Sequence, residues 1–151
     1  AKNLEVRTAY KYFDISTDFK AGNLQKPIQP QNRFFANISY QTELNDKNSQ
    51  WKFDVTYNNI GEQRLPNTVS NPVQYQLPVN ADSYQLLNSQ ITKVFSDKFE
   101  VYVGAENLTN VMQKNPILAS DDPFGPYFDS TMVYAPIFGR AIYTGLRFKI
   151  K

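Results

Sequence analysis

The chain has 151 residues, enough for one domain, and its mean hydropathy of −0.52 comes with no run of the roughly 18 apolar residues that a membrane helix needs. It contains neither Cys nor His, which excludes disulfides, thiolate chemistry, imidazole catalysis and imidazole metal sites within the chain. With 16 basic and 14 acidic residues, the net charge of +2 is too balanced to indicate a nucleic-acid partner. Membrane strands are not excluded, because their alternating faces average out to mild polarity.

The first half of the chain contains three segments in which apolar and polar side chains alternate, the pattern of β-strands with two different faces. These predicted strands cover residues 4–15, 32–44 and 51–60. A region with Gly and Pro, residues 16–31, separates the first two and is predicted to be a long loop. Only the polar turn of residues 45–50 separates the second from the third.

The second half contains three more predicted strands, which cover residues 84–95, 98–109 and 137–151. Long proline-containing loops, residues 61–83 and 110–136, precede the first and the last of them. A tight turn at Ser96 and Asp97 joins the other two.

The closing segment alternates strictly. Thr144, Leu146 and Phe148 would share one face, with Gly145 and Arg147 on the other. We expect one face of this strand to be apolar and the other to be wet.

Together these patterns predict an all-β fold of six antiparallel strands of about 10–13 residues, longer than the roughly 5–6 that are usual in soluble sheets. A tilted strand needs about 9–11 residues to cross a bilayer. All nine prolines lie in the three long loops. Because short turns on one side and long loops on the other are typical of outer-membrane barrels, we expect an antiparallel transmembrane β-barrel segment with short periplasmic turns and long extracellular loops.

Two architectures fit alternating strands. In a soluble barrel or sandwich the apolar face is the core, whereas in a membrane barrel it meets lipid and the polar face lines the lumen. Aromatic residues gather near both ends of the predicted strands, which favours lipid; they are Trp51, Phe95, Phe99 and Phe148 on the short-turn side, and Tyr10, Tyr12, Phe34 and Tyr57 toward the long loops. Lys93 on the apolar face counts against lipid, but near a short turn its ammonium can extend to the interface.

The number of strands leaves the architecture open, because single-chain membrane barrels start at about eight. The chain is the C-terminal piece of a larger barrel, or several copies share one barrel, or it forms a small eight-stranded barrel with two strands hidden in the pattern. The first ten residues, AKNLEVRTAY, contain neither an initiator Met nor the apolar centre of a signal peptide. We therefore expect the first alternative, a chain cut from something longer.

Two segments near the end of the chain carry a resemblance to a known family. ENLTN at residues 106–110 is followed by a long loop and then by PIFGRAIYTGLRF at residues 136–148. This arrangement resembles the C-terminal end of TonB-dependent outer-membrane receptors, in which an Asn-Leu-Thr/Phe element ends the penultimate strand and a Pro-x-Gly-Arg-like turn begins the last. The resemblance is sharpest over residues 99–151, and the style of the final loop and terminus is similar to Bacteroidetes-type members.

The resemblance implies that residues 1–151 are the C-terminal part of a barrel domain in the bacterial outer membrane, the last six strands of a barrel of about 22 strands. It implies energised uptake of a scarce nutrient such as a metal chelate, a siderophore or cobalamin, with an oligosaccharide less favoured because a stretch typical of glycan importers is missing. The implied partners are outer-membrane lipid, the remaining strands and plug of the same receptor, TonB through that plug, and a surface lipoprotein; no cofactor is implied. A small self-contained outer-membrane barrel with an adhesive or structural role, and a soluble β-barrel binding module, remain the alternatives.

The last long loop contains the first candidate site, the run DDPFGPYFD. At an extracellular face its aromatic rings could stack on a ligand or partner and its carboxylates could bind cations or donors, whereas the alternative is a proline-stiffened loop packed on its neighbours. The residues concerned are Asp121, Asp122, Phe124, Tyr127, Phe128 and Asp129. Their spacing matches no EF-hand pattern, so no metal site is predicted.

The second candidate group consists of charged side chains on the polar faces of the strands. They are Arg7, Lys11, Asp54, Glu100, Glu106 and Arg147. In a plugged barrel such residues would mainly bond the plug and secondarily a ligand. Glu100 and Glu106 would lie about 20 Å apart along one strand, too far for a glycosidase pair. Without His no Ser–His–Asp set can form, and there is no Gly-rich phosphate loop, so no enzymatic activity is predicted.

Overall fold

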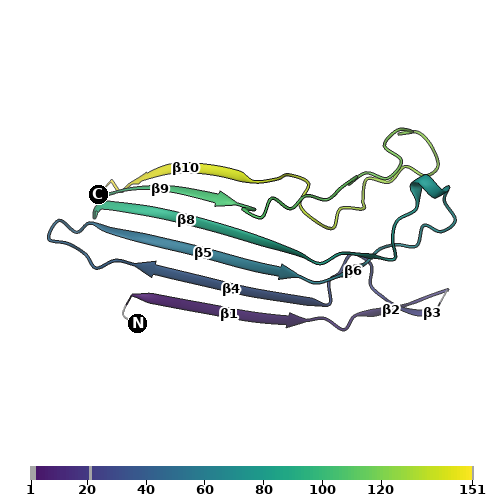
Figure 1. The fold of residues 1–151 in the computed structure, drawn as a ribbon, viewed down its shortest axis with the longest axis horizontal. Helices are drawn as coiled ribbons and strands as arrows, with labels where there is room; N and C mark the ends of the chain where they lie inside the picture. The colour runs from purple at the N-terminus through teal and green to yellow at the C-terminus, as the bar shows by residue number, and fades with distance from the viewer. Residues whose placement is uncertain (1–2, 21, 151) are drawn as a thin grey trace.

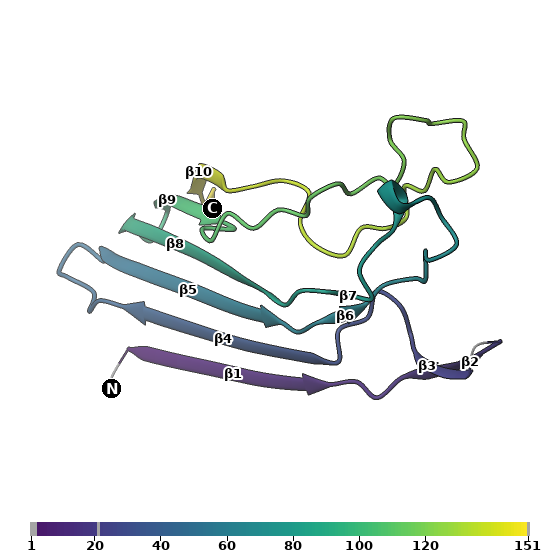
Figure 2. The same cartoon turned by 45° about the vertical axis from the view of Figure 1, so that its right-hand side comes forward.

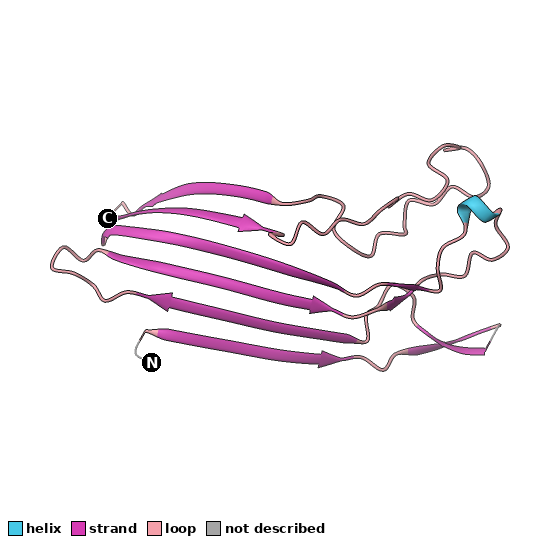
Figure 3. Ribbon diagram, in the orientation of Figure 1, coloured by secondary structure: helices cyan, strands magenta, loops and turns pink. Residues whose placement is uncertain are grey.

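A computed structural model, which describes residues 3–20 and 22–150, shows six long strands in one antiparallel sheet (Figures 1 and 3). The strands are β1 (Leu4–Tyr12), β4 (Asn32–Gln41), β5 (Gln50–Ile60), β8 (Tyr84–Ser96), β9 (Phe99–Glu106) and β10 (Ala141–Phe148). They pair in the order β1-β4-β5-β8-β9-β10, so that each long strand lies beside the next long strand of the chain. The predicted all-β fold with six antiparallel strands is confirmed. The sheet is open, because within the described residues β1 and β10 each pair along one side only.

The register keeps the apolar side chains of neighbouring strands on one face. Phe53 of β5 stands opposite Tyr40 of β4 and opposite Ile91 of β8, and Ile91 in turn stands opposite Val103 of β9. A slip by one residue would move every apolar side chain of a strand to the polar face, so this alternation fixes the pairing. The alternation seen in the sequence is therefore the two-faced pattern of the sheet.

Several predicted strand bounds were too long. Residues 13–15, 42–44, 107–109, 137–140 and 149–150 were expected to be strand and lie outside it, whereas Gln50, expected in a turn, begins β5. Strand β9 ends at Glu106 because Asn107 has a φ of +50°, a left-handed conformation that breaks the ladder. Lys151, the last residue of the predicted closing strand, lies outside the described residues.

The turn between β8 and β9 also differs from the expected position. Ser96 still belongs to β8 and pairs with Phe99, after a register shift between Val94 and Ser96. The shift is a bulge, which inserts an extra residue into one strand of the ladder. The turn therefore lies one residue further along, at Asp97 and Lys98.

The predicted long loops contain short elements that the sequence pattern did not reveal. Residues 16–31 include the hairpin of β2 (Ser16–Phe19) and β3 (Gly22–Gln25), and Gly22 has a φ of +111°, which suits glycine alone. Residues 61–83 include the paired strands β6 (Gln63–Arg64) and β7 (Asn80–Ala81) and the 3₁₀ turn η1 (Val73–Tyr75). Within the described residues there is no helix long and apolar enough to cross a membrane.

The long loops gather at one end of the sheet and the short turns lie at the other, as Figures 1 and 2 show. We call the described residues of segments 13–31, 61–83 and 107–140 the loop assembly. A backbone hydrogen bond from Ile28 N to Arg64 O at 2.8 Å joins the first two segments. Side-chain bonds from Gln63 to Tyr134 O and from Tyr75 to Asp121 join the second to the third. Most of the buried apolar side chains belong to it, among them Leu65, Ala81 and Met132. The core of the molecule thus lies beside the sheet and not beneath it.

Candidate functional site

The six charged residues predicted to share a polar face do lie on one face of the sheet. Arg147 stands opposite Glu100, Asp54 stands opposite Ser39, and the other three have the same parity in the ladder. The structure divides them into two bonded clusters and three residues near the edges and ends of strands.

The first cluster is centred on Asp54 of β5. Asn37 of β4 donates from Nδ2 to both carboxylate oxygens of Asp54 at 3.1 Å, and also to Thr56 Oγ1 at 2.9 Å. Ser39 Oγ donates to Asp54 Oδ2 at 2.8 Å. Asn37 is only 7% exposed, so these bonds satisfy polar groups that water barely reaches. The carboxylate is held in one orientation across two strands.

The second cluster is centred on Glu100 of β9, whose side chain is 15% exposed. The guanidinium of Arg147 forms an ion pair with Glu100 Oε1, and Lys52 Nζ lies 4.0 Å from Glu100 Oε2. The Arg147 guanidinium carbon also lies 5.9 Å from the centre of the Tyr102 ring. Three strands therefore contribute to one charge cluster near the short turns.

Two tyrosines cover glycines between these clusters. The Tyr143 ring lies where a Cβ on Gly104 would be, and the Tyr102 ring does the same at Gly145. The two rings meet edge to face, with centroids 6.3 Å apart. The Tyr143 hydroxyl donates to Gln90 Oε1 at 3.1 Å, which links β10 to β8 across β9. Glycine is needed here because the rings approach the backbone of the neighbouring strand.

The remaining three charged residues make fewer contacts. Arg7 Nε lies 2.8 Å from Glu5 Oε1 on the edge strand, where both side chains are more than half exposed. Lys11 Nζ lies 4.4 Å from the centre of the Phe13 ring. Glu106 lines a hollow of about 220 Å³ together with Asp54. Among the described residues, the Lys11 and Glu106 side chains make no hydrogen bond or ion pair, and Arg7 pairs with Glu5 alone.

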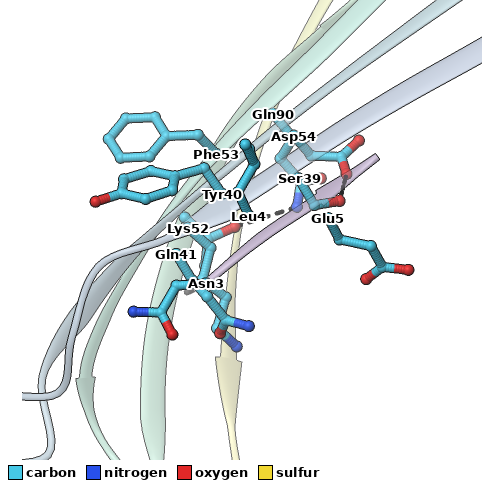
Figure 4. A pocket seen from close by; sticks show the side chains of 11 residues that line it. Asn3, Leu4, Glu5, Ser39, Tyr40, Gln41, Lys52, Phe53, Asp54 and Gln90 are labelled. Carbon is cyan, nitrogen blue, oxygen red and sulfur yellow. Dashed lines mark hydrogen bonds between the residues drawn. The ribbon is translucent and has the colours of Figure 1, made fainter. Parts of the chain in front are cut away.

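A larger hollow of about 480 Å³ lies on the sheet near the short turns (Figure 4). Its lining residues come from β1, β4, β5 and β8 and include Asp54, Ser39 and Gln90. Figure 4 shows the rings of Tyr40 and Phe53 directed to the opposite side of the ribbon from these three. The hollow therefore presents carboxylate, hydroxyl and amide groups, and its chemistry suits a polar partner.

In the predicted loop site, Asp121 is bonded within the loop assembly. Its Oδ2 accepts a hydrogen bond from the Tyr75 hydroxyl at 2.8 Å. This bond, with smaller contributions from burial and from the charges of Asp121 and Asp122, raises the pKa of Tyr75 above 10.0. The Tyr127 ring lies 6.0 Å from the Tyr75 ring. Asp121 and Tyr127 thus join two long loops to each other.

The rest of this predicted site is divided between turn formation and exposure. Asp129 accepts from Thr131 N at 2.7 Å and from Thr131 Oγ1 at 2.6 Å, so it caps a turn. Asp122 accepts at its backbone carbonyl from Gly125 N at 3.0 Å. Phe124 is fully exposed, and the Phe128 side chain is partly so. Among the described residues no group of three His, Cys, Asp or Glu side chains is placed to hold a metal ion.

The two segments that carry the family resemblance contact each other directly. Arg140 N donates to Asn110 Oδ1 at 3.0 Å, and Arg140 Nη2 donates to Leu108 O at 2.8 Å. Asn107 Nδ2 donates to Phe138 O at 3.2 Å. We call these five residues the Asn–Arg clasp. The sequence did not predict this contact, although both segments were recognisable in it.

Two buried glutamines of the loop assembly were also missed. Gln113, 9% exposed, donates from Nε2 to Met132 O at 2.6 Å and accepts at Oε1 from Tyr134 N at 2.9 Å and Ala135 N at 3.2 Å. Gln63, 3% exposed, donates to Tyr134 O at 3.1 Å. A single glutamine in a polar loop carries no periodic signal, so no pattern in the sequence could have identified them.

The opposite face of the sheet is apolar and carries aromatic side chains toward both ends of the strands. Near the short turns the rings of Phe95 and Phe99 stack at 5.6 Å, and Trp51 lies in the same band. Nearer the long loops the rings of Phe34 and Tyr57 lie 6.3 Å apart.

No protein-family model, no curated protein and no solved structure matches this chain.

Proposed function

We propose that the chain forms part of the wall of an outer-membrane β-barrel, and that this barrel is a TonB-dependent receptor that imports a scarce nutrient such as a metal chelate, a siderophore or cobalamin. One observation carries the proposal. Within residues 3–20 and 22–150 the sheet has no second layer on either face, and its apolar face bears aromatic bands at both ends.

The exposure of the apolar face supports the proposal that this face contacts lipid. Val6 is 58% exposed, Leu146 68% and Ile142 75%. A contiguous apolar face of this kind is unfavourable in water by roughly 25 cal/mol for each Å² left uncovered. Lipid chains would cover it, and the aromatic rings would lie at the two interfaces of the bilayer.

The side chains of the polar face support the proposal that this face lines a lumen filled by a plug. The Asp54 and Glu100 clusters are already satisfied within the sheet, while Lys11 and Glu106 have no hydrogen bond or ion pair among the described side chains. A plug that filled the lumen would meet these charges and the polar hollow beside Asp54. In that arrangement the clusters hold the wall together and the free charges bond the plug or the cargo.

The connections and the open edges support an incomplete barrel. Short turns lie at one end and structured loops at the other, as expected for the periplasmic and extracellular sides. The unpaired edges of β1 and β10 would leave backbone groups without partners in lipid, so further strands must close the sheet. The Asn–Arg clasp connects the two segments that resemble the receptor family and so supports that family over other barrels.

Cysteine labelling tests the topology, since the chain itself contains no Cys. Phe124→Cys in the exposed loop and Lys47→Cys in a short turn are introduced into the longest polypeptide that carries this chain, expressed in its bacterium. A membrane-impermeant maleimide should label Phe124→Cys on intact cells and Lys47→Cys only after permeabilisation. Equal labelling of the two variants on intact cells would exclude a barrel that spans the membrane in this orientation.

Uptake of radiolabelled cobalamin and of iron chelates tests the receptor assignment separately. Uptake of one of them should require both this protein and an intact TonB system. Correct topology with no TonB-dependent uptake or growth phenotype would keep the barrel and exclude the receptor.

A further inference from the structure

Lys93 of β8 is the one charged side chain on the apolar face of the six described long strands. Its register partners are Trp51 of β5 and Val101 of β9, both of which belong to that face. Lys93 lies close to the end of β8 that leads into the short turn. It is therefore placed within the aromatic band at the short-turn end.

The ammonium of Lys93 has aromatic neighbours but no anionic one. Its Nζ lies 4.8 Å from the centre of the Trp51 ring and 6.0 Å from the centre of the Phe95 ring. No carboxylate of the described residues forms an ion pair with it. Aromatic faces offset part of the cost of a cation in apolar surroundings, but an anion would compensate it better.

An apolar groove of about 320 Å³ begins at this lysine. Trp51, Phe95 and Lys93 line it, and so do Ile91 and Val103, which lie further toward the middle of the sheet. It therefore combines a single cation at the short-turn end with an apolar floor along the strands. An anionic headgroup joined to a hydrocarbon chain has the complementary pair of properties.

We propose that Lys93 and this groove bind one anionic phospholipid of the membrane leaflet at the short-turn side. The phosphate would accept from the Lys93 ammonium, and an acyl chain would lie against Ile91 and Val103. This inference rests on the proposed function, because it requires that the apolar face meet lipid. An anionic headgroup is favoured over a zwitterionic one because the latter brings its own cation to the same place.

Trp51 is the reporter of this site, because it is the chain's single tryptophan and lies against Lys93. The longest polypeptide that carries the chain is reconstituted with a small fraction of chain-brominated phosphatidylglycerol or chain-brominated phosphatidylcholine in an unbrominated background. Emission of a Trp51→Phe variant is subtracted, so that quenching of Trp51 alone is measured. Brominated phosphatidylglycerol should associate about fivefold more strongly than brominated phosphatidylcholine, the preference expected for one lysine at an anionic lipid.

Two variants assign the preference to Lys93. Lys93→Gln should lower the ratio of phosphatidylglycerol to phosphatidylcholine association to about one. Lys93→Arg should retain the preference because the cation remains. Lys98→Gln, which removes a charge from the adjacent turn, should leave most of the preference intact.

Each result bears on one of the two proposals. Equal quenching by the two lipids in the unaltered protein, or a preference that survives Lys93→Gln, would overturn the lipid site and leave the membrane barrel standing. Absence of quenching by either lipid would show that Trp51 does not face lipid, and would overturn the barrel proposal together with the site. The comparison of the two lipids in the unaltered protein decides the matter even if a variant does not fold.

Discussion

The sheet and the loop assembly differ in what surrounds their side chains. In the sheet, apolar residues such as Ile142 remain three-quarters exposed, and no described segment forms a second layer over either face. In the loop assembly, Leu65 is 2% exposed and the amide of Gln113 bonds three backbone groups. The long strands therefore contribute only Ile60 and Val94 to the buried apolar core of the described residues, and the loop assembly contributes the rest.

This difference indicates what each part needs from its surroundings. Backbone groups that the loops bury away from water need partners within the protein, and the buried amide side chain of Gln113 supplies them. A sheet with two bare faces gains its stability from material on those faces, which we propose to be lipid on one side and a plug on the other. Loss of a loop contact should therefore act locally, whereas loss of a sheet contact should be felt across the strands.

The largest expected effect is that of Gln113→Ala. The substitution leaves Met132 O, Tyr134 N and Ala135 N without their partner, at about 1–3 kcal/mol for each buried group that stays unpaired. The loop assembly should lose at least about 3 kcal/mol of local stability, seen as faster amide hydrogen exchange over residues 132–135. Lys114→Ala, an exposed neighbour, is the control. Equal loss of protection in β5 and β8 would show that the loops and the sheet are one cooperative unit.

Asn37→Ala tests the sheet in the same way. It removes the amide nitrogen that bonds both oxygens of Asp54 in one shared contact, and a hydrogen bond to a charged group contributes about 1.5–3 kcal/mol. The denaturant midpoint of the detergent-folded protein should fall by the equivalent of about 2 kcal/mol. Asn58→Ala, on the same face and without a side-chain hydrogen bond among the described residues, should change it by less than about 0.5 kcal/mol. A similar loss in both variants would mean that the Asp54 cluster does not stabilise the sheet.

Gly104→Ala should have a smaller effect. The added methyl group would collide with the tip of the Tyr143 ring, and because that ring can move, the loss should be about 1 kcal/mol, at the lower end for overpacking. Removing the ring in the double variant Gly104→Ala/Tyr143→Ala should remove the penalty of the methyl group. A double-mutant cycle measured by chemical denaturation would give the coupling. Additive effects would exclude the contact.

The smallest effect is expected at Tyr75. The hydrogen bond to Asp121 raises the pKa of this tyrosine above 10.0, so the bond is intact below pH 10 and is lost as the pH rises through the higher value of the folded protein. The phenolate absorbance of the protein minus that of Tyr75→Phe should therefore show a titration above pH 10. Near neutral pH the link between the loops should not respond to pH through this residue. Titration of Tyr75 at or below pH 10 would contradict the contact.

Most of the sheet could be predicted from the sequence, because period-two alternation reports directly on a two-faced strand. It located all six long strands, and it placed Asp54 and Glu100 on the same face. Alternation failed to locate the ends of the strands, because backbone conformation determines where a strand ends. Asn107 adopts a φ of +50° that ends β9, although the sequence continues a strand-like pattern to residue 109.

The loop assembly could not be predicted, because its order comes from contacts between residues far apart in the chain. The strands β2 and β3 have four residues each and contain only one large apolar side chain apiece, Phe19 and Leu24, so no alternation of apolar residues marked the hairpin. Gln63 reaches Tyr134 across 71 residues, and no local pattern encodes that distance. In the DDPFGPYFD run the sequence showed which groups were available. Only the structure showed that Asp121 and Asp129 are used within the loops while Phe124 is left outside.

The Asn–Arg clasp has a consequence for how this protein can change over evolution. It closes the chain between Asn107 and Arg140 at the point where β9 and β10 leave the sheet. The entropy of closing a loop grows only slowly with its length, so a closed base allows the segment beyond it to lengthen or be replaced at little expense. The strands can then stay in register while the tip is exchanged for one that recognises something new. We expect the exposed tip around Phe124, beyond the buried contacts of Gln113 and Met132, to be the most readily altered part of this protein.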